Sequence, residues 1–173
     1  MLKGDNIKLR AMEPSDVDVL YQWENEPEIW KVSNTLTPYS KYVLTKYIDE
    51  SHHDIYINKQ LRLMICDNND KVVGSVELFE FDAYHQRVGV GIVISASSDR
   101  NKGYASETLH IIKNYCFNTL GLTQVFCNIT ADNLPSVALF EKAGYKLCGT
   151  KKEWTRQGHE FKDELMYQLL ADK

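Results

Sequence analysis

The sequence predicts a mixed α+β fold, in which a central, mostly antiparallel seven-stranded sheet carries helices on both faces. The order of residue patterns is β α α β β β α β α β β, and such mixed connectivity is typical of this class. Three strand-type segments between residues 61 and 95 are separated by short polar turns that favour antiparallel pairing. The 173 residues are 43% hydrophobic and 25% charged, without repeats or linkers, so we expect residues 1–173 to form a single domain.

The N-terminal third is predicted to contain a short strand and two helices. Residues 7–10 alternate apolar and polar side chains as a strand does, and the proline and acids of residues 13–16 suit the first turn of a helix. We expect residues 25–27 to end that helix, and a second amphipathic helix to run to about residue 51. The His-His-Asp sequence at 52–54 lacks the spacing of metal ligands, so we expect a loop and no metal site.

Period-two patterns and turn signals define the rest of the sheet. Further strands are expected at residues 61–66, 71–82, 87–95, 124–130, 145–154 and 160–170. An apolar 3–4–4 spacing predicts a helix over residues 105–120, and Gly121 is expected to end it. Asn133, with a proline two residues later, predicts the start of another helix, which Gly144 is expected to end.

The strand expected at residues 87–95 has two glycines on one face. Gly89 and Gly91 weaken a sheet, and glycine inside a strand usually marks a bulge or the close approach of another group. That group could be a ligand or a crowding side chain, and the sequence leaves both open.

A basic, glycine-containing turn connects this strand to the next helix. Residues 100–103, Arg-Asn-Lys-Gly, stand between the strand end at Ser95 and a helix start near Tyr104. The first N–H groups of a helix are unpaired, and the helix dipole places partial positive charge there. Gly103 can adopt backbone angles that point consecutive N–H groups into one concavity. The turn therefore suits a phosphate or pyrophosphate, or it is an ordinary solvated connection.

Charge and cysteine content narrow the classes of function. A formal net charge of −4 argues against general nucleic-acid binding. The four cysteines include no closely spaced pair typical of a metal or redox motif, and three of them lie in apolar surroundings, so buried free thiols are the simplest interpretation. The first residues lack the apolar run of a signal peptide, and no stretch approaches a membrane span. We expect a cytoplasmic protein that binds neither nucleic acid nor membranes.

Two motifs resemble those of a known enzyme family. Residues 100–105, Arg-Asn-Lys-Gly-Tyr-Ala, resemble the (Arg/Gln)-x-x-Gly-x-(Gly/Ala) pyrophosphate loop of the GNAT N-acetyltransferases. At the expected distance downstream, residues 133–145 are similar to the family segment Asn-x-x-(Ser/Ala)-x-x-Leu-Tyr-Glu-Lys-x-Gly-Phe. Residues 74–78, 85–87 and 91–95 resemble the branch that holds spermidine, diamine and ribosomal-protein N-terminal acetyltransferases.

The resemblance implies a GNAT-like acyl-CoA N-acyltransferase fold with acetyl-CoA as the acyl donor. By carry-over, the loop N–H groups would bind the pyrophosphate, the preceding strand would hold the pantetheine arm, and the Asn133 segment would flank the thiol. The cofactor-binding residues implied in this way are Ile92, Val93, Ile94, Ser95, Arg100, Asn101, Lys102, Gly103, Tyr104, Ala105, Asn133, Ser136 and Phe140. Asn133 is also a helix cap in either case, and Phe140 suits a core equally well.

Two departures from the family pattern concern the chemistry. The family's frequent general-acid tyrosine is replaced by Phe140, which has no proton to donate, so a leaving thiolate would need help from water or Ser136. Gly89 and Gly91 stand where related enzymes often carry polar or acidic side chains, so the base must lie elsewhere.

Glu77 is our candidate for the catalytic base. Its carboxylate lies in a strand between apolar neighbours, where a charge is costly unless it has a partner or a task. A structural ion pair or a partly exposed strand residue is the alternative explanation. Glu24, Glu26 and Glu28 could attract a cationic amine, or they form a solvated acidic loop.

These features predict an acetyl-CoA-dependent N-acetyltransferase that acts on a primary amine of a small molecule or peptide. A small polyamine-like amine is favoured. The alternatives are a ribosomal-protein-type N-terminal acetyltransferase and a catalytically silent acyl-CoA-binding sensor, which the phenylalanine at position 140 motivates. The chain could act alone or as a homo-oligomer such as a dimer.

Overall fold

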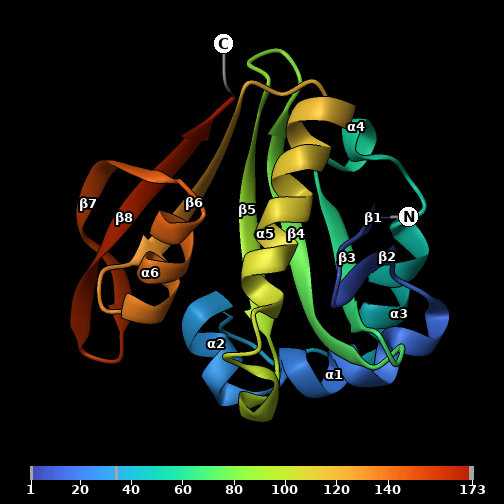
Figure 1. The fold of residues 1–173 in the computed structure, drawn as a ribbon. Coiled ribbons are helices and arrows are strands. Elements are labelled where there is room, and N and C mark those ends of the chain that lie inside the picture. Colours follow the sequence, from blue (N-terminus) through green and yellow to red (C-terminus); the bar gives the residue numbers. More distant parts are fainter. Residues whose placement is uncertain (1, 34, 172–173) are drawn as a thin grey trace.

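A computed structural model describes residues 2–33 and 35–171. This part of the chain contains one eight-stranded sheet with the order β1-β2-β3-β4-β5-β6-β8-β7 (Figure 1). The strands are β1 (Leu2–Lys3), β2 (Ile7–Ala11), β3 (Leu61–Asp67), β4 (Val72–Asp82), β5 (Arg87–Ile94), β6 (Gln124–Thr130), β7 (Lys146–Gln157) and β8 (Glu160–Leu170). The predicted α+β class is confirmed, because neighbouring strands are antiparallel except for β5 and β6, which are parallel.

The expected number of seven strands is wrong by one. The additional strand is β1, which pairs with β2 through Leu2↔Leu9 and Lys3↔Lys8. Two residues are too few to show a period-two pattern, so the sequence could not indicate this strand.

Helices α1 (Val17–Glu24) and α3 (Lys41–Glu50) occupy the segments in which the sequence predicts them. The structure adds α2 (Pro27–Ser33) and a single turn, α4 (Ile55–Asn58), where the sequence predicted connecting segments. Proline suits the first position of a helix, so Pro27 begins α2 as well as following the end of α1. The remaining helices are α5 (Tyr104–Asn114), continued by a π-helical turn at Tyr115–Thr119, and α6 (Leu134–Lys142).

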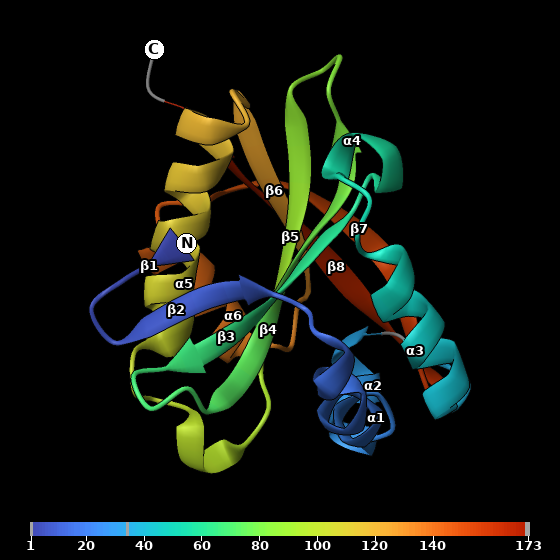
Figure 2. The ribbon, with the colours of Figure 1, turned by 90° about the vertical axis from the view of Figure 1, so that its right-hand side faces the viewer.

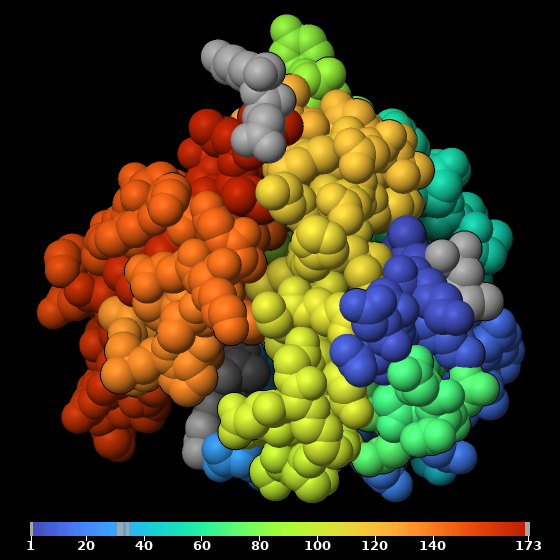
Figure 3. Space-filling view, in the orientation of Figure 1, coloured from blue at the N-terminus to red at the C-terminus, as the bar shows by residue number. Residues whose placement is uncertain are grey.

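The helices cover both faces of the sheet, as predicted (Figure 2). On one face, Leu109 and Ile112 of α5 pack into a buried cluster with Val88 and Val90 of β5. On the other face, α1 and α3 pack against β3 in a second buried cluster, formed by Met12, Leu20, Leu44, Ile48, Met64 and Cys66. The space-filling view shows α5 as a continuous ridge between α6 and the N-terminal strands (Figure 3). None of the helices in the described ranges has the length and apolar character needed to cross a membrane.

The sheet divides between β5 and β6. In the described residues these parallel strands pair at three positions, Arg87↔Gln124, Val88↔Val125 and Gly89↔Phe126, and they diverge beyond (Figure 1). β5 continues to pair with β4, and the N–H of Ser95 donates to the carbonyl of Val73 at 3.1 Å. Because backbone groups alternate in direction along a strand, the N–H groups of Ile92 and Ile94 point into the divide.

Candidate active site

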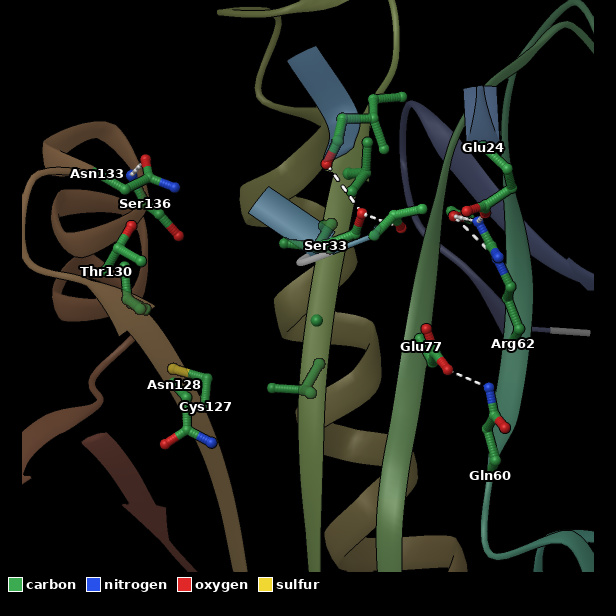
Figure 4. Close-up of a pocket in the computed structure, with 18 of the residues that line it drawn as sticks. Glu24, Ser33, Gln60, Arg62, Glu77, Cys127, Asn128, Thr130, Asn133 and Ser136 are labelled. Carbon is green, nitrogen blue, oxygen red and sulfur yellow. Dashed lines mark hydrogen bonds and ion pairs between the residues drawn. The ribbon is translucent and has the colours of Figure 1, made fainter. Parts of the chain in front are cut away.

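A cavity of about 440 Å³ lies where β5 and β6 separate, and residues of α1, α2, α3 and α6 border it. One wall is formed by β3, β4 and β5, and the other by β6, β8 and α6 (Figure 4). The polar side chains that line it belong to Glu24, Ser33, Thr35, Tyr39, Tyr47, Gln60, Arg62, Ser75, Glu77, Asn128, Thr130, Asn133, Ser136 and Glu164.

Glu77 lies on β4 within this cavity, paired in register with Gly91 of β5. The side-chain amide of Gln60 donates a hydrogen bond to Oε1 of Glu77 (Figure 4). Burial raises the pKa of Glu77, and the carboxylate of Glu24 adds to this increase. The positive charge of Arg62 and the hydrogen bond from Gln60 act against it. Glu77 is therefore a half-buried carboxylate with increased affinity for a proton.

The two strand glycines have different surroundings. A Cβ at Gly89 would lie 2.3 Å from the ring of Phe79, so this glycine makes room for a crowding side chain. A Cβ at Gly91 would have its nearest neighbour, also Phe79, at 3.8 Å. Gly91 therefore leaves open space in the cavity beside Glu77. The crowding side chain is confirmed at Gly89, whereas the approach of a ligand at Gly91 stays a prediction.

Arg62 of β3 connects the acidic groups on this wall. Its Nη2 lies 2.6 Å from Oε1 of Glu24, and the two side chains are 14% and 12% exposed. Arg62 also donates from Nε and Nη2 to Oγ of Ser75, at 3.3 and 3.2 Å. Glu24 already has this cationic partner, whereas Glu77 shares the influence of the same guanidinium at longer range. The wall thus combines one guanidinium with two carboxylates.

Tyr47 of α3 completes this wall. Its hydroxyl oxygen accepts a hydrogen bond of 3.1 Å from Nε2 of Gln60, the same amide group that donates to Glu77. Burial raises the pKa of Tyr47 to about 12, and the charge of Glu77 adds to the increase. Tyr47 therefore stays protonated at neutral pH and can donate a hydrogen bond into the cavity.

The opposite wall carries the residues of α6. Asn133 caps this helix, with Oδ1 accepting a 3.3 Å hydrogen bond from the N–H of Ser136. The ring of Phe140 is 2% exposed and meets the ring of Tyr145 edge to face, with centroids 5.0 Å apart. Burial raises the pKa of the neighbouring Cys127 thiol to about 12, so this cysteine is not a thiolate nucleophile.

The loop after β5 has the backbone geometry of an anion-binding turn. Asn101 and Gly103 have φ angles of 61° and 84°, and α5 begins at the next residue, Tyr104. These left-handed conformations turn the chain so that the N-terminus of an 11-residue helix faces outward at the end of β5. Arg100 is exposed and donates from Nε to the carbonyl of Ile94 at 3.4 Å.

Lys102 contacts a carboxylate in this structure. Its Nζ lies 2.9 Å from Oδ1 of Asp99, and Nζ of Lys71 lies 2.6 Å from Oδ2 of the same residue. The Asp99 side chain is 5% exposed. Hydrogen bonds from Lys102 and Lys71 lower the pKa of Asp99, so it remains ionised. Asp99 thus ties the loop to the turn between β3 and β4.

Comparison with known proteins decides the family. The family model described as an acetyltransferase (GNAT) domain matches residues 6–146. The chain belongs to the GNAT acetyltransferase family. It is 25% identical over 171 residues to an uncharacterised N-acetyltransferase of Bacillus licheniformis, covering 98% of this chain and 95% of the relative. It is also 25% identical to the spermidine N(1)-acetyltransferase of Vibrio cholerae, covering 82% of this chain and 80% of that enzyme.

The GNAT fold is also found in solved structures. The crystal structure of spermidine N-acetyltransferase from Vibrio cholerae in complex with CoA and spermine superposes with a TM-score of 0.87. The two chains share 23% identity, and the match covers 95% of each. A GNAT-family acetyltransferase from Bacillus anthracis superposes with a TM-score of 0.82 at 20% identity, covering 97% of this chain and 96% of that one. The likeness extends over almost the whole fold.

Six of the fourteen site residues predicted from the sequence line the cavity, namely Glu77, Ile92, Val93, Asn133, Ser136 and Phe140. Their roles in binding and catalysis stay predictions. Ile94, Ser95 and residues 100–105 continue from the cavity along β5 to the start of α5. Among the acidic residues considered, Glu24 lines the cavity, whereas Glu26 does not.

Sequence reasoning missed Tyr47, Gln60 and Arg62. Tyr47 lies in the second amphipathic helix expected from the sequence, and Gln60 and Arg62, around the start of β3, belong to no motif. A signal was available in Arg62, because a cation inside an apolar strand needs a partner, as a carboxylate does.

Proposed function

We propose that this GNAT acetyltransferase transfers the acetyl group of acetyl-CoA to a primary amine, with a small polyamine-like amine as acceptor. The observation that carries the proposal is the position of Glu77, whose half-buried carboxylate lies opposite Gly91 in the cavity at the divided sheet. The Vibrio cholerae relative named as a spermidine acetyltransferase supports the choice of acceptor class.

The residues present fit the acyl donor of the family. Acetyl-CoA supplies an activated thioester when bound. The inward-pointing N–H groups of Ile92 and Ile94 offer hydrogen bonds to the pantetheine arm and the thioester oxygen, since the divide leaves them without a strand partner among the described residues. The left-handed turn at Asn101 and Gly103 and the start of α5 offer N–H groups to the pyrophosphate.

The role of Glu77 follows from the protonation of the acceptor. A free alkylammonium has a pKa of roughly 10.4, so a proton must leave before the nitrogen can attack a thioester. A carboxylate with a raised pKa accepts that proton more readily than an ordinary one. We assign this task to Glu77, acting directly or through one water molecule.

The departing thiolate needs less help than an alkoxide would. A thiol pKa of roughly 8.5 makes it a good leaving group. Phe140 cannot donate a proton, so the hydroxyl of Ser136 or a water molecule beside it is the proposed source. Acid–base catalysis at the amine and binding of both substrates in one cavity then account for the rate.

The charges of the cavity favour a cationic acceptor. Glu24, Glu77 and Glu164 line it, together with one lining cation, Arg62. Oε1 of Glu164 also lies 2.5 Å from Nζ of Lys151, which is not one of the residues that line the cavity. The excess of carboxylates attracts an amine in its protonated form and keeps it close to the proposed base.

A thiol-release assay with acetyl-CoA and a panel of acceptors tests the proposal. We expect turnover with spermidine and linear diamines, and weak or no turnover with peptides that carry a free N-terminus. Turnover of peptides alone would replace the acceptor class by protein N-termini. Binding of CoA without turnover of any acceptor would favour the acyl-CoA sensor instead.

We further propose that the enzyme is cytoplasmic and consists of a single domain. All four cysteines are free, and Cys66, Cys116 and Cys127 are buried, as expected for a protein in a reducing compartment. Localisation of a tagged full-length chain tests the first part, and a single cooperative unfolding transition tests the second.

A further inference from the structure

The strand register places Arg62 directly opposite Glu77. The two residues are partners across β3 and β4, so their side chains leave the sheet on the same face, where opposite charges attract one another. The guanidinium of Arg62 nevertheless lies 2.6 Å from Oε1 of Glu24, the last residue of α1, and it donates to Oγ of Ser75 (Figure 4). Among the described residues, the proposed base therefore has no direct ion pair.

Glu77 has a neutral partner in place of the guanidinium. The side-chain amide of Gln60 donates to Oε1 of Glu77, and the same nitrogen donates to the hydroxyl of Tyr47 at 3.1 Å. The backbone next to Gln60 is fixed to β4, because the N–H of Phe81 donates to the carbonyl of Lys59 at 3.0 Å. Two acceptors and an anchored backbone restrict the orientation of the Gln60 amide, and with it the orientation of the carboxylate.

The charge of its partner decides how well a carboxylate accepts a proton. An adjacent guanidinium stabilises the ionised form and makes it a weaker base, whereas a neutral amide orients the carboxylate with a smaller loss of basicity. Burial raises the pKa of Glu77, and the positive charge of Arg62 opposes that increase. Glu24 counteracts Arg62 in two ways, because its charge raises the pKa of Glu77 and its ion pair holds the guanidinium away.

We propose that Gln60 and Glu24 are positioning residues for the base. Gln60 holds the Glu77 carboxylate in the orientation in which it meets the amine, and Glu24 keeps Arg62 from pairing with that carboxylate. This inference rests on the proposed acetylation of an amine, and it specifies how the base of that reaction is kept both oriented and basic. Neither residue needs to touch the acceptor.

The pH dependence of kcat/KM, measured with an amine that the wild type acetylates, tests the two roles because the two variants should move it in opposite directions. Gln60→Leu removes a hydrogen bond that stabilises the ionised carboxylate, so the low-pH limb of the profile should move to higher pH. The plateau should also fall about tenfold, because the base is no longer oriented. Glu24→Gln frees Arg62 to pair with Glu77, so the low-pH limb should move to lower pH.

Other side chains that can titrate also line the cavity, and a second set of variants separates them from Glu77. These side chains belong to Glu24, Tyr39, Tyr47, Arg62, Cys127 and Glu164. In a Glu77→Gln background, neither substitution should move the low-pH limb. The double variant Glu24→Gln/Arg62→Gln leaves no uncompensated buried charge, so it should fold even if Glu24→Gln alone does not. Its low-pH limb should not move below that of the wild type, because the guanidinium is gone.

Two controls match these variants. Gln168→Leu removes a half-buried glutamine amide that donates to Gln124, and neither glutamine lines the cavity. Asp16→Asn breaks another buried ion pair with an arginine, Arg10, also outside the lining. Both controls should leave the low-pH limb in place. Circular dichroism shows whether each variant is folded at the assay temperature.

Shifts of Gln60→Leu and Glu24→Gln in the same direction, or shifts no larger than those of the controls, would overturn the proposal. A move of the double variant to lower pH would also overturn it. Failure of the proposed function is distinct, since the wild type would then acetylate no amine. A carbon NMR titration of the Glu77 carboxyl group measures the same shifts without turnover, so opposite shifts there would support the arrangement even when acetylation is absent.

Discussion

Glu77 and Gly91 are register partners across β4 and β5, so the half-buried carboxylate lies beside a position without a side chain. We expect Glu77→Gln to lower kcat/KM by about 10²-fold, because a general base contributes that order of rate. Glu80→Gln, on an exposed residue of the same strand, is the control and should leave the rate unchanged. An unchanged rate in Glu77→Gln would remove Glu77 as the base.

The raised pKa of Glu77 gives a second prediction, for the pH dependence. The proposed base must be ionised to accept a proton, so kcat/KM should decrease as the pH falls through a pKa above the ordinary glutamate value. The effect on stability has the opposite sign, because the raised pKa means that protonated Glu77 favours the folded over the unfolded protein. This contribution is fully present below the ordinary glutamate pKa of about 4.3 and is lost as the pH rises through the pKa of the folded state. Glu77→Gln should therefore gain stability over the wild type as the pH increases, in thermal unfolding at several pH values. A difference that shrinks with increasing pH would contradict this.

Two buried tyrosines provide a matched test of hydrogen bonding. The hydroxyl of Tyr167 donates to Glu141 at 2.9 Å, whereas that of Tyr145 has no partner within the described residues. Tyr145→Phe should leave the free energy of unfolding unchanged or raise it by about 1 kcal/mol, because it removes an unpaired buried group. Tyr167→Phe should lower it by about 1 kcal/mol. Denaturant unfolding measures both, and a larger loss for Tyr145→Phe would show that its hydroxyl has a partner.

Asp99 is predicted to position the loop for which we propose binding of the acyl donor. Asp99→Asn keeps the shape but removes the charge that holds Lys71 and Lys102, so we expect KM for acetyl-CoA to rise about tenfold. The KM for the amine should not change, because the amine cavity does not include this residue. Asp70→Asn, which removes an exposed ion pair with Lys8, is the control. Equal changes in both KM values would indicate general loss of structure.

Asp16 should account for part of the acid sensitivity of the fold. Burial alone would raise its pKa, but two hydrogen bonds from Arg10, at 2.7 and 2.8 Å, and one from the N–H of Glu13 lower it overall. The stabilisation is present above the ordinary aspartate pKa and is lost as the pH falls through the lowered folded value.

Asp16→Asn should cost about 3 kcal/mol at neutral pH and flatten the acid limb of the stability curve. Asp18→Asn serves as control because Asp18 makes an exposed ion pair with Lys41. Chemical denaturation between neutral and acidic pH measures the difference, and parallel curves for the two variants would refute the assignment.

Local patterns explain which parts of the fold were predictable. The strand expected at residues 124–130 coincides with β6, because alternation and the flanking turns lie within one short window. Glu77 was identifiable for the same reason, since a carboxylate between apolar neighbours is visible in the sequence. The division between β5 and β6 was not, because it depends on where two distant strands stop pairing.

The arrangement of Tyr47, Gln60 and Arg62 required the structure for a physical reason. Their contacts depend on how α1 and α3 pack across β3, and helix packing is not recorded in the periodicity of any one segment. Helix α2 was missed for a different reason, because Pro27 is compatible both with the end of one helix and with the start of the next.

The three-pair connection between β5 and β6 also has a mechanical consequence. In the described residues β5 and β6 pair at three positions, whereas β4 and β5 pair at seven, so the two parts of the sheet separate more easily between β5 and β6 than between β4 and β5. A ligand that accepts hydrogen bonds from the N–H groups of Ile92 and Ile94 would connect the two parts of the sheet across the gap between β5 and β6. Those two amides should exchange hydrogen rapidly in the free protein and slowly once CoA is bound.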